Sequence, residues 1–302
     1  MGHKNGSITY QISQEYKSME AFGESKHQAK KTDETRGKIY SFETMKDYIR
    51  AGTAFGRYCK EKHSCRTIAA CRAYVEEYLQ TRIDSCAPST VKLDAAAIAK
   101  LYRCSTRDFD IKTPERTRAG ITRSRYARNM DKHFSEKKNA DLVLFCRATG
   151  LRRSEVEKVK GTQLIYKDGR YYVYIERGQG KGGREREVPI IGDPATVRRV
   201  VQLMTAAGTG KVFSRVHAAA DIHGYRAEYA AALYRQNARP LDVCLREPFY
   251  NPSRGKEDKT SVYYCRKEQR GKWFDKAAML IVSRALGHNR ISVVGENYLY
   301  NV

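Results

Sequence analysis

Several patterns that identify common protein classes are missing from this sequence of 302 residues. Its eight cysteines form no C-x-x-C pair, so no zinc spacing is present, and without a secretory signal we expect reduced thiols in a cytosolic protein. The longest apolar runs are far too short to span a membrane. A G-x-x-x-x-G-K-[ST] motif is absent, which argues against nucleotide hydrolysis. Asp and Glu form no cluster beside the basic residues, which makes a metal-dependent nuclease the least favoured enzyme class.

Acidic residues are too few to balance the basic ones. Lys and Arg number 57 against 34 Asp and Glu, which gives a formal net charge of +23. The basic residues recur along the whole chain, and this favours a nucleic acid as partner over a merely solvated basic surface. Hydrophobic residues make up 41% of the chain, enough for folded cores, and the length fits one or two domains.

The composition divides the chain into successive stretches. Residues 1–37 are polar and of mixed charge, and we expect a partly disordered N-terminal arm with a short local element around Ile8–Tyr16. Residues 38–110 carry successive helical patterns and predict a small helical bundle. Residues 111–130 are basic with little apolar periodicity and indicate a linker, and residues 131–302 form the largest domain.

The largest domain is expected to combine helices with a few strands. A helix is predicted over Asn139–Gly150, ended by its final glycine. Tyr171–Arg177 and Arg184–Ile191 alternate as the two strands of a hairpin, and Asp221–Ala238 predicts a long helix. Residues 240–276 break the pattern and are interpreted as an insertion that contains a small hairpin near its end. The expected fold class is therefore mainly α with a small antiparallel β-sheet (α+β).

Six residues in the second half of the chain are suited to attack on a phosphodiester. A tyrosine hydroxyl can displace one side of a phosphodiester if cationic side chains hold the non-bridging oxygens and an acid protonates the leaving oxygen. Arginine suits the first task because its planar fork meets two phosphate oxygens, and lysine can supply the proton. Neither task needs a metal or another cofactor. The candidates, in chain order, are Arg152, Lys181, His223, Arg226, His288 and Tyr298.

Each candidate also has an ordinary structural alternative. Arg152 follows a Gly-Leu turn and could be a surface residue, and Arg153 competes for its place. Lys181 lies between glycines at the predicted hairpin tip, where lysine is common. The His-x-x-Arg pair is on one helix face but could be a surface pair, and Tyr298 has Tyr300 as a rival. The order of the residues, more than any single one, carries the hypothesis.

With these residues the chain resembles the tyrosine recombinase (phage-type integrase) family. The resemblance is carried by ATGLRRSEV, GQGKGGREREVPI, DIHGYRAEYA and LGHNRISVVGENYL, from about Asp131 to the end, and more loosely by the helical bundle before it. The resemblance implies that the scissile phosphate is bound by Arg152, His223 and Arg226. It also implies that Lys181 protonates the departing 5′ oxygen, His288 helps to hold the phosphate and Tyr298 forms a 3′-phosphotyrosine.

Glu155 matches a carboxylate that supports the site in this family. The alternative is an ordinary glutamate in the first turn of a helix, where a negative charge is favourable. The sequence departs from the family pattern in the long interval between His223 and His288, which contains the insertion. Tyr263–Arg266, within the insertion, imitates a degenerate His-x-x-Arg, but the helical context favours the earlier pair. Four residues follow Tyr298, whereas many relatives use a longer segment to latch onto a neighbouring subunit, so the mode of subunit interlock stays open.

The resemblance implies two domains that clamp double-stranded DNA: a helical core-binding domain (SAM-like bundle) over 38–110 and a catalytic domain over 131–302. It implies a site-specific recombinase or integrase that passes through a Holliday junction as a homo-tetramer, and a monomer or weak oligomer without DNA. Integration or excision of a mobile element or phage is expected in the prokaryotic cytoplasm at the nucleoid, with an accessory DNA-bending or directionality protein and no membrane. A type IB-like topoisomerase and a catalytically inactive sequence-specific DNA-binding protein are the alternatives.

Overall fold

The computed structural model describes residues 6–32, 34–115, 117, 134–180, 185–252, 254–288, 290–300 and 302. The chain separates into two compact units, Met1–Gly120 and Ile121–Val302, and each has its own buried hydrophobic core. Helices dominate both units and small antiparallel sheets occur in the second, so the predicted fold class is confirmed. No helix in the described ranges is long and apolar enough to cross a membrane. Most of the linker expected over residues 111–130 lies outside the described residues.

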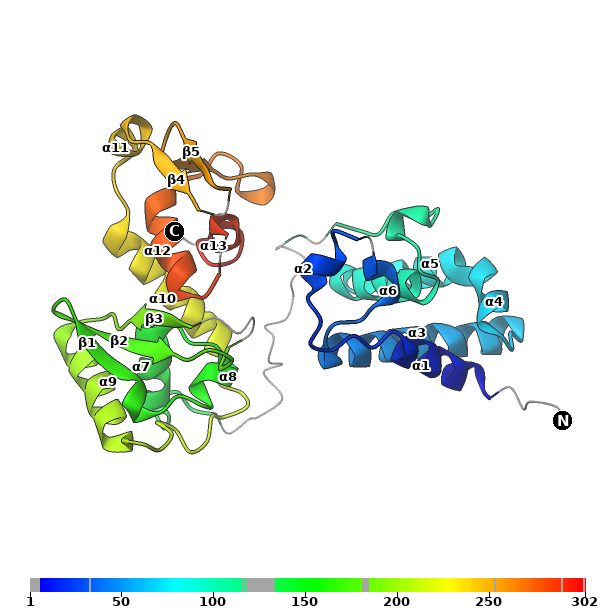
Figure 1. The fold of residues 1–302 in the computed structure, drawn as a ribbon, viewed down its shortest axis with the longest axis horizontal. Helices are drawn as coiled ribbons and strands as arrows, with labels where there is room; N and C mark the ends of the chain where they lie inside the picture. Colours follow the sequence, from blue (N-terminus) through cyan, green and yellow to red (C-terminus); the bar gives the residue numbers. More distant parts are fainter. Residues whose placement is uncertain are drawn as a thin grey trace. The chain divides into compact units, whose positions relative to one another are not determined.

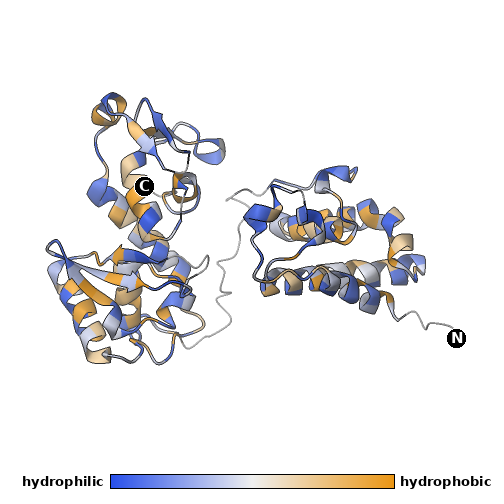
Figure 2. Ribbon diagram, viewed as in Figure 1, coloured by the Kyte–Doolittle hydropathy of each residue, from blue (hydrophilic) through white to orange (hydrophobic). Residues whose placement is uncertain are grey.

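The first unit is built from helices around α3 (Figure 1). The helices are α1 (Ile8–Ser18), α2 (Lys26–Ala29), α3 (Phe42–His63), α4 (Ile68–Cys71), α5 (Val75–Ser85) and α6 (Pro88–Leu101). Short 3-10 turns cover Glu34–Gly37 (η1), Arg72–Tyr74 (η2) and Thr106–Asp108 (η3). Helix α3 packs against α1, α4, α5 and α6. In Figure 2 these helices carry both hydrophobic and hydrophilic residues, as expected of amphipathic helices around a core.

Helix α1 packs against α3 at very short range. Its buried residues Ile8, Ile12 and Tyr16 are spaced four apart and therefore share one face of the helix. They meet α3 at two glycines: a Cβ atom would lie 2.5 Å from the Tyr16 ring if added at Gly52, and 2.5 Å from Ile12 Cδ1 if added at Gly56. Only glycine therefore permits this approach of the two helices.

The packing of α1 contradicts the expectation of a partly disordered arm over residues 1–37, although the short local element expected around Ile8–Tyr16 is present as α1. Helix α1 belongs to the core of the first unit, and the buried Tyr16 hydroxyl donates a hydrogen bond to the Ala97 carbonyl of α6 at 2.8 Å. The polar composition of the stretch conceals a short apolar face. The complementary surface for that face is a glycine pair on α3, more than thirty residues further along the chain.

The second unit contains the remaining elements. Its helices are α7 (Ala140–Thr149), α8 (Arg153–Val156), α9 (Pro194–Ala207), α10 (Ile222–Asn237), α11 (Leu241–Arg246), α12 (Lys276–Ala285) and α13 (Ile291–Asn297). Its strands are β1 (Leu164–Lys167), β2 (Arg170–Ile175), β3 (Arg186–Pro189), β4 (Phe249–Asn251), β5 (Lys256–Asp258), β6 (Val262–Tyr264) and β7 (Trp273–Asp275). The 3-10 turns are η4 (Gly161–Gln163) and η5 (Lys267–Gln269).

Strands β1, β2 and β3 form an antiparallel sheet with β2 in the centre. Val173 of β2 faces Leu164 of β1 on one side and Val188 of β3 on the other, and the fully buried Val173 and Val188 point into the core. The predicted hairpin is confirmed as β2 and β3, but the sequence analysis did not anticipate β1. Lys181, predicted at the hairpin tip, lies outside the described residues.

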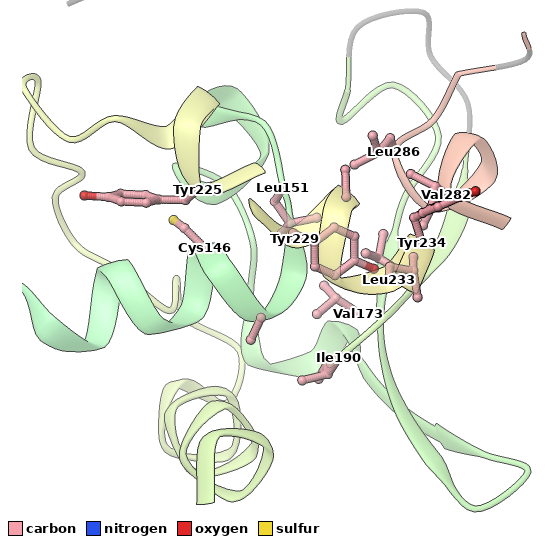
Figure 3. Packing of buried hydrophobic residues seen from close by; sticks show 14 of the residues in the cluster. Cys146, Leu151, Val173, Ile190, Tyr225, Tyr229, Leu233, Tyr234, Val282 and Leu286 are labelled. Atoms are coloured by element: carbon pink, nitrogen blue, oxygen red, sulfur yellow. The ribbon is translucent and has the colours of Figure 1, made fainter. Parts of the chain in front are cut away.

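The core of the second unit lies between this sheet and three helices. Helix α10 packs against α7 and α12, and α12 packs against β3. Figure 3 shows Tyr229 and Leu233 of α10 among core residues from the sheet and α12, including Val173 and Val282. The fully buried Tyr229 also donates a hydrogen bond to the Pro189 carbonyl of β3 at 2.9 Å. This packing fixes α10 and α12, the two helices that carry or precede most of the candidate residues.

Residues 240–276 contain α11 and two antiparallel hairpins, β4–β5 and β6–β7. The small hairpin predicted near the end of this stretch is confirmed as β6–β7, whereas β4–β5 was not anticipated. Figure 1 shows α11 and the β4–β5 hairpin in the same part of the second unit as α12 and α13. We call residues 240–276 the inserted segment.

Candidate active site

Arg152 is placed by the turn between α7 and α8. Gly150 ends α7 in the left-handed conformation at φ 58°, as predicted, and Leu151 is fully buried. Arg152 is the N-cap residue of α8. The carboxylate of Glu155 reaches back to it and accepts hydrogen bonds from the Arg152 backbone N–H at 2.8 Å and from its guanidinium at 3.0 Å. The turn therefore holds the Arg152 side chain in one orientation.

Glu155 is the buried anion of the site. It is 0% exposed, and besides the contacts with Arg152 it accepts a hydrogen bond from Arg186 Nη2 at 2.7 Å. Burial raises the pKa of this carboxyl, but the hydrogen bond and charge of Arg186, together with Arg152, lower it by more, so the pKa lies below its ordinary value. Glu155 is therefore ionised at neutral pH and orients two arginines.

Arg226 is a buried cation from the same face of α10 as His223. It is 2% exposed and donates hydrogen bonds of 2.5 Å to the carbonyls of Gly150 and Leu286. Burial is the main cause that lowers the pKa of Arg226; Tyr298 opposes this effect and the charge of Arg152 adds to it. The guanidinium stays protonated because arginine does not lose its proton in proteins. No carboxylate among the described residues lies within salt-bridge distance of it.

Tyr298 brings its hydroxyl to this cation. It is the C-cap residue of α13, and the fully buried Leu299 anchors the chain directly after it. The Tyr298 hydroxyl lies 3.4 Å from Arg226 Nε and 3.3 Å from His288 Nε2. The centre of its ring is 5.8 Å from that of His223. Residues 223, 226, 288 and 298 thus meet around one phenol.

A cavity of about 670 Å³ opens beside this phenol. It is lined by Arg152, Arg153, Ser154, Glu157, Ile222, His223, Arg226, Gly287, His288 and Tyr298. Five of the seven predicted site residues line it, and Glu155, which is outside the lining, supports it through its contact with Arg152. Positive side chains around a partly enclosed cavity suit an anion, and a phenol at its wall suits a nucleophile.

The rival residues have other surroundings. Arg153 borders the cavity, but its guanidinium donates hydrogen bonds to the carbonyls of His217 and Ala220 and so fixes the loop before α10. Tyr300 is absent from the described lining of the cavity, and its carbonyl accepts a hydrogen bond from Lys272. Tyr263, the first residue of the degenerate His-x-x-Arg sequence Tyr263–Arg266, lies in β6 and packs near Gly295.

Sequence comparison and structural comparison give different results for this chain. No protein-family model matches the sequence, and no curated protein matches it. The structure of XerH site-specific recombinase bound to palindromic difH substrate, a post-cleavage complex, matches with a TM-score of 0.52 at 12% identity over 97% of this chain and 91% of that one. The pre-cleavage complex of XerH with difH matches with a TM-score of 0.50 at 12% identity over 97% and 92%. This chain has a tyrosine-recombinase fold.

Within the tyrosine-recombinase fold, Arg186 is a site residue that the sequence analysis missed. It reaches Glu155 from β3, and its Nε donates a hydrogen bond to the Ala285 carbonyl at the end of α12 at 2.9 Å. Its side chain is only 8% exposed. In the sequence it is one of several alternating charged residues in a predicted strand, and nothing in that alternation shows which one turns inward.

The hairpin of the tyrosine-recombinase fold approaches the site on its β2 side. A Cβ atom at Gly180 would lie 2.3 Å from Glu155 Oε1, so only glycine allows the chain to pass the carboxylate this closely. Gly180 is the last described residue before Lys181. The hairpin therefore contacts the carboxylate that orients Arg152.

The lowered pKa of His288 makes the stability of the folded protein depend on pH. Burial and then the charges of Arg226, Arg152 and Arg186 lower the pKa of His288 from 6.5 to about 4, so the ring is neutral at pH 7. Between pH 6.5 and about 4 the His288 ring binds a proton in the unfolded chain but not in the folded chain. The free energy of unfolding therefore decreases as the pH falls through that window.

We expect the difference in unfolding free energy between wild type and His288→Gln to shift in favour of the variant by about 1–2 kcal/mol between pH 7 and pH 4.5. The full shift would allow about 3 kcal/mol, and partial exposure of the ring to solvent reduces it. Urea denaturation at several pH values measures this. His27→Gln, at an exposed position of α2, is the control. A difference that stays constant with pH would contradict the prediction.

Proposed function

We propose that this protein is a site-specific DNA recombinase in which Tyr298 attacks a DNA phosphodiester and forms a covalent 3′-phosphotyrosine. One observation carries the proposal. The buried Arg226 guanidinium has no carboxylate partner among the described residues and lies 3.4 Å from the Tyr298 hydroxyl, at the wall of a cavity. A buried cation without an anion is unfavourable unless a ligand supplies the charge. The scissile phosphate is such a ligand, and it would lie against the nucleophile.

The remaining cavity residues take complementary roles in this proposal. Arg152 and Arg226 bind the non-bridging oxygens of the phosphate, where negative charge grows in the transition state. His223 and the neutral His288, whose ring centres lie 5.8 Å and 5.6 Å from that of Tyr298, complete the phosphate site. Glu155 and Arg186 touch no substrate and keep Arg152 in place.

The proposed cleavage step exchanges one phosphodiester bond for another, and side chains of the protein accept and donate the protons without a metal. The Tyr298 oxygen forms a bond with phosphorus while the bond from phosphorus to the 5′ oxygen breaks. The phenolic proton passes to His288, whose Nε2 lies 3.3 Å away. Although the pKa of this ring is about 4 in the free protein, a bound phosphate offsets the repulsion from the arginines and raises it. Lys181 gives a proton to the departing 5′ oxygen, and religation reverses these transfers.

The proposed role of Lys181 is supported by the sequence and by the described part of the hairpin. Lys181 itself lies outside the described residues. Its neighbour Gly180 passes close to Glu155, and β2 and β3 pair on either side of the tip, which supports this role. A lysine is able to act as general acid when nearby positive charges favour loss of its proton.

Double-stranded DNA is the proposed partner. The net charge of +23 favours a polyanion, and the XerH recombinases with the same fold were solved with their difH substrates. We further propose that residues 38–110 form a DNA core-binding domain and residues 131–302 the catalytic domain. Four copies would exchange strands through a Holliday junction, aided by an accessory protein, to integrate or excise a mobile element or phage at a prokaryotic nucleoid.

The proposal is tested with nicked suicide duplexes drawn from the DNA on either side of the gene. A nick close to the cleavage point releases the short fragment that carries the new 5′ hydroxyl. Religation then lacks its acceptor, so the covalent intermediate accumulates. We expect a slowly migrating protein–DNA band on a denaturing gel that forms equally in EDTA and disappears after protease treatment.

Each other outcome identifies a different protein. Cleaved DNA without an attached protein, abolished by EDTA, would indicate a metal-dependent nuclease. Site-specific binding without any adduct would indicate a DNA-binding protein on an inactive scaffold. Relaxation of supercoils by a monomer at unrelated sequences would indicate a type IB-like topoisomerase. All three results overturn the proposal.

A further inference from the structure

The inserted segment contacts the chain on both sides of Tyr298. Gln269, buried in η5, donates a hydrogen bond through Nε2 to the Gly295 carbonyl at 2.9 Å. Lys272, next to β7, donates through Nζ to the Tyr300 carbonyl at 3.0 Å, and its ammonium lies 6.0 Å from the centre of the Tyr300 ring. One contact is therefore three residues before Tyr298 and the other two residues after it.

Gly295 allows α13 to sit directly against the inserted segment. A Cβ atom at this position would lie 3.1 Å from Met279 Cε of α12, 3.4 Å from the Tyr263 ring and 3.8 Å from the Phe274 ring. The last two residues belong to β6 and β7. The close approach of backbone to ring surfaces leaves α13 little freedom to shift relative to the hairpin.

An ion pair between the partly exposed Arg239 and the buried Asp275 joins the two ends of the inserted segment. Arg239, just before the segment, donates hydrogen bonds of 2.7 Å to both carboxylate oxygens of Asp275, which is 0% exposed. Asp275 also accepts from Ser261 at 3.0 Å and from the backbone N–H of Ala277 at 2.8 Å, where it caps α12. Burial raises the pKa of Asp275, but these hydrogen bonds, that of Arg239 foremost, lower it below its ordinary value. The segment is thus fixed to the helix that leads to His288.

We propose that the β6–β7 hairpin with η5 is a brace that positions the Tyr298 segment of its own chain, and that Gln269 and Lys272 are its positioning residues. The inference rests on the proposed function. In-line attack requires the phenol oxygen to stay aligned with the phosphate, and a misplacement of about 1 Å costs on the order of 10²-fold in rate. The brace contacts no DNA phosphate in this role; it acts through the position of Tyr298.

The variants Lys272→Met and Gln269→Met test the brace in the full-length chain. We expect adduct formation at saturating protein to slow about 10-fold for Lys272→Met and about 10²-fold for the double variant, because the phenol loses its alignment. The dissociation constant for the same duplex should change less than about 3-fold, and Lys272→Arg should restore most of the rate. Lys256→Met, which removes an exposed lysine of β5 in the same segment, is the control for charge and should react like wild type.

A substrate with a 5′ sulfur at the scissile bond separates positioning from acid catalysis. A thiolate leaves without protonation, so loss of a general acid is rescued by this substrate while misalignment of the nucleophile is not. We expect Lys181→Ala to regain rate on the sulfur substrate and Lys272→Met to stay slow. Rescue of Lys272→Met would overturn the brace and indicate a role in proton transfer.

Mixing two variants tests whether the brace acts on its own chain. Tyr298→Phe keeps the brace, and the double variant Gln269→Met/Lys272→Met keeps the tyrosine. If the brace acts within one chain, the mixture forms adduct no faster than the double variant alone. A mixture that regains the wild-type rate overturns the inference.

The two proposals fail in different ways. If the wild-type protein forms no adduct, the proposed recombinase function is wrong. If wild type forms the adduct and Gln269→Met/Lys272→Met matches its rate, only the brace is wrong. Lys272 is exposed, so the single variant tests the brace without risk to folding, and the thermal unfolding midpoint verifies this.

Discussion

Tyr298→Phe should leave no detectable covalent protein–DNA adduct on a nicked suicide duplex, while the dissociation constant for that duplex stays within about 3-fold of wild type. The change removes one oxygen atom, the one that lies 3.3 Å from His288 and 3.4 Å from Arg226. The phenylalanine ring still fits between the same neighbours, so folding and binding are preserved. Without the oxygen no phosphotyrosine can form, and no other group replaces it as nucleophile.

Tyr300→Phe is the matched control for this prediction. Tyr300 is two residues away and carries the same chemical group, but it is not among the described residues that line the cavity. Its carbonyl, which the substitution leaves intact, accepts the hydrogen bond from Lys272. We expect adduct formation at a rate close to that of wild type. Loss of the adduct in Tyr300→Phe together with its survival in Tyr298→Phe would identify Tyr300 as the nucleophile and contradict the assignment to Tyr298.

Arg226→Ala should slow adduct formation by more than about 10²-fold with little loss of DNA affinity. The guanidinium is placed where charge develops on the phosphate, and removal of one such donor costs about 10²–10³-fold in other enzymes. Most of the DNA affinity comes from many phosphate contacts elsewhere, so one buried arginine contributes a small share. Single-turnover rates at saturating protein, together with equilibrium binding, separate the two effects.

Two further variants make the Arg226 result specific. Arg235→Ala removes the same charge from an exposed position of the same helix and should leave the rate unchanged. Arg226→Ala also removes the donor to the Gly150 carbonyl, which costs about 1–3 kcal/mol, whereas the Leu286 carbonyl keeps the hydrogen bond from Arg152 at 2.9 Å. Rates should therefore be compared well below the unfolding midpoint of the variant. Equal rates for Arg226→Ala and Arg235→Ala would contradict the assigned role.

Local sequence patterns predicted much of the scaffold of the site. The alanine-rich composition of 221–238, followed by Pro240, predicted α10, and the three-residue spacing of His223 and Arg226 predicted their shared face. Gly150 predicted the end of α7 and so the exposed turn that carries Arg152. These features depend on contacts within one or two helical turns, which a local pattern contains.

Contacts between distant residues could not be predicted in the same way. Arg186 and Glu155 are 31 residues apart, and Arg226 and Leu286 are 60 apart. Both pairs form only because the sheet, α10 and α12 pack around one core. Glu155 was predicted from a family resemblance, but the burial of this carboxylate between two arginines is a property of the tertiary structure.

The first unit illustrates the same limit. The stretch around Ile8–Tyr16 has few apolar residues, and only their spacing of four indicates a buried face. Its partner surface is formed by Gly52 and Gly56, residues that disfavour a helix when considered alone. The value of these glycines, and the inclusion of α1 in the core, becomes visible only when the two helices are seen together.

The central claim is that the phenol oxygen of Tyr298 becomes bonded to DNA phosphorus. The most direct test is mass spectrometry of the wild-type adduct after nuclease trimming and proteolysis. The account predicts a nucleotide attached through its 3′ phosphate to the peptide that contains Tyr298, with fragment ions that place the added mass on that residue. Attachment to Tyr300, to a serine or to a histidine, or through a 5′ phosphate, would contradict it.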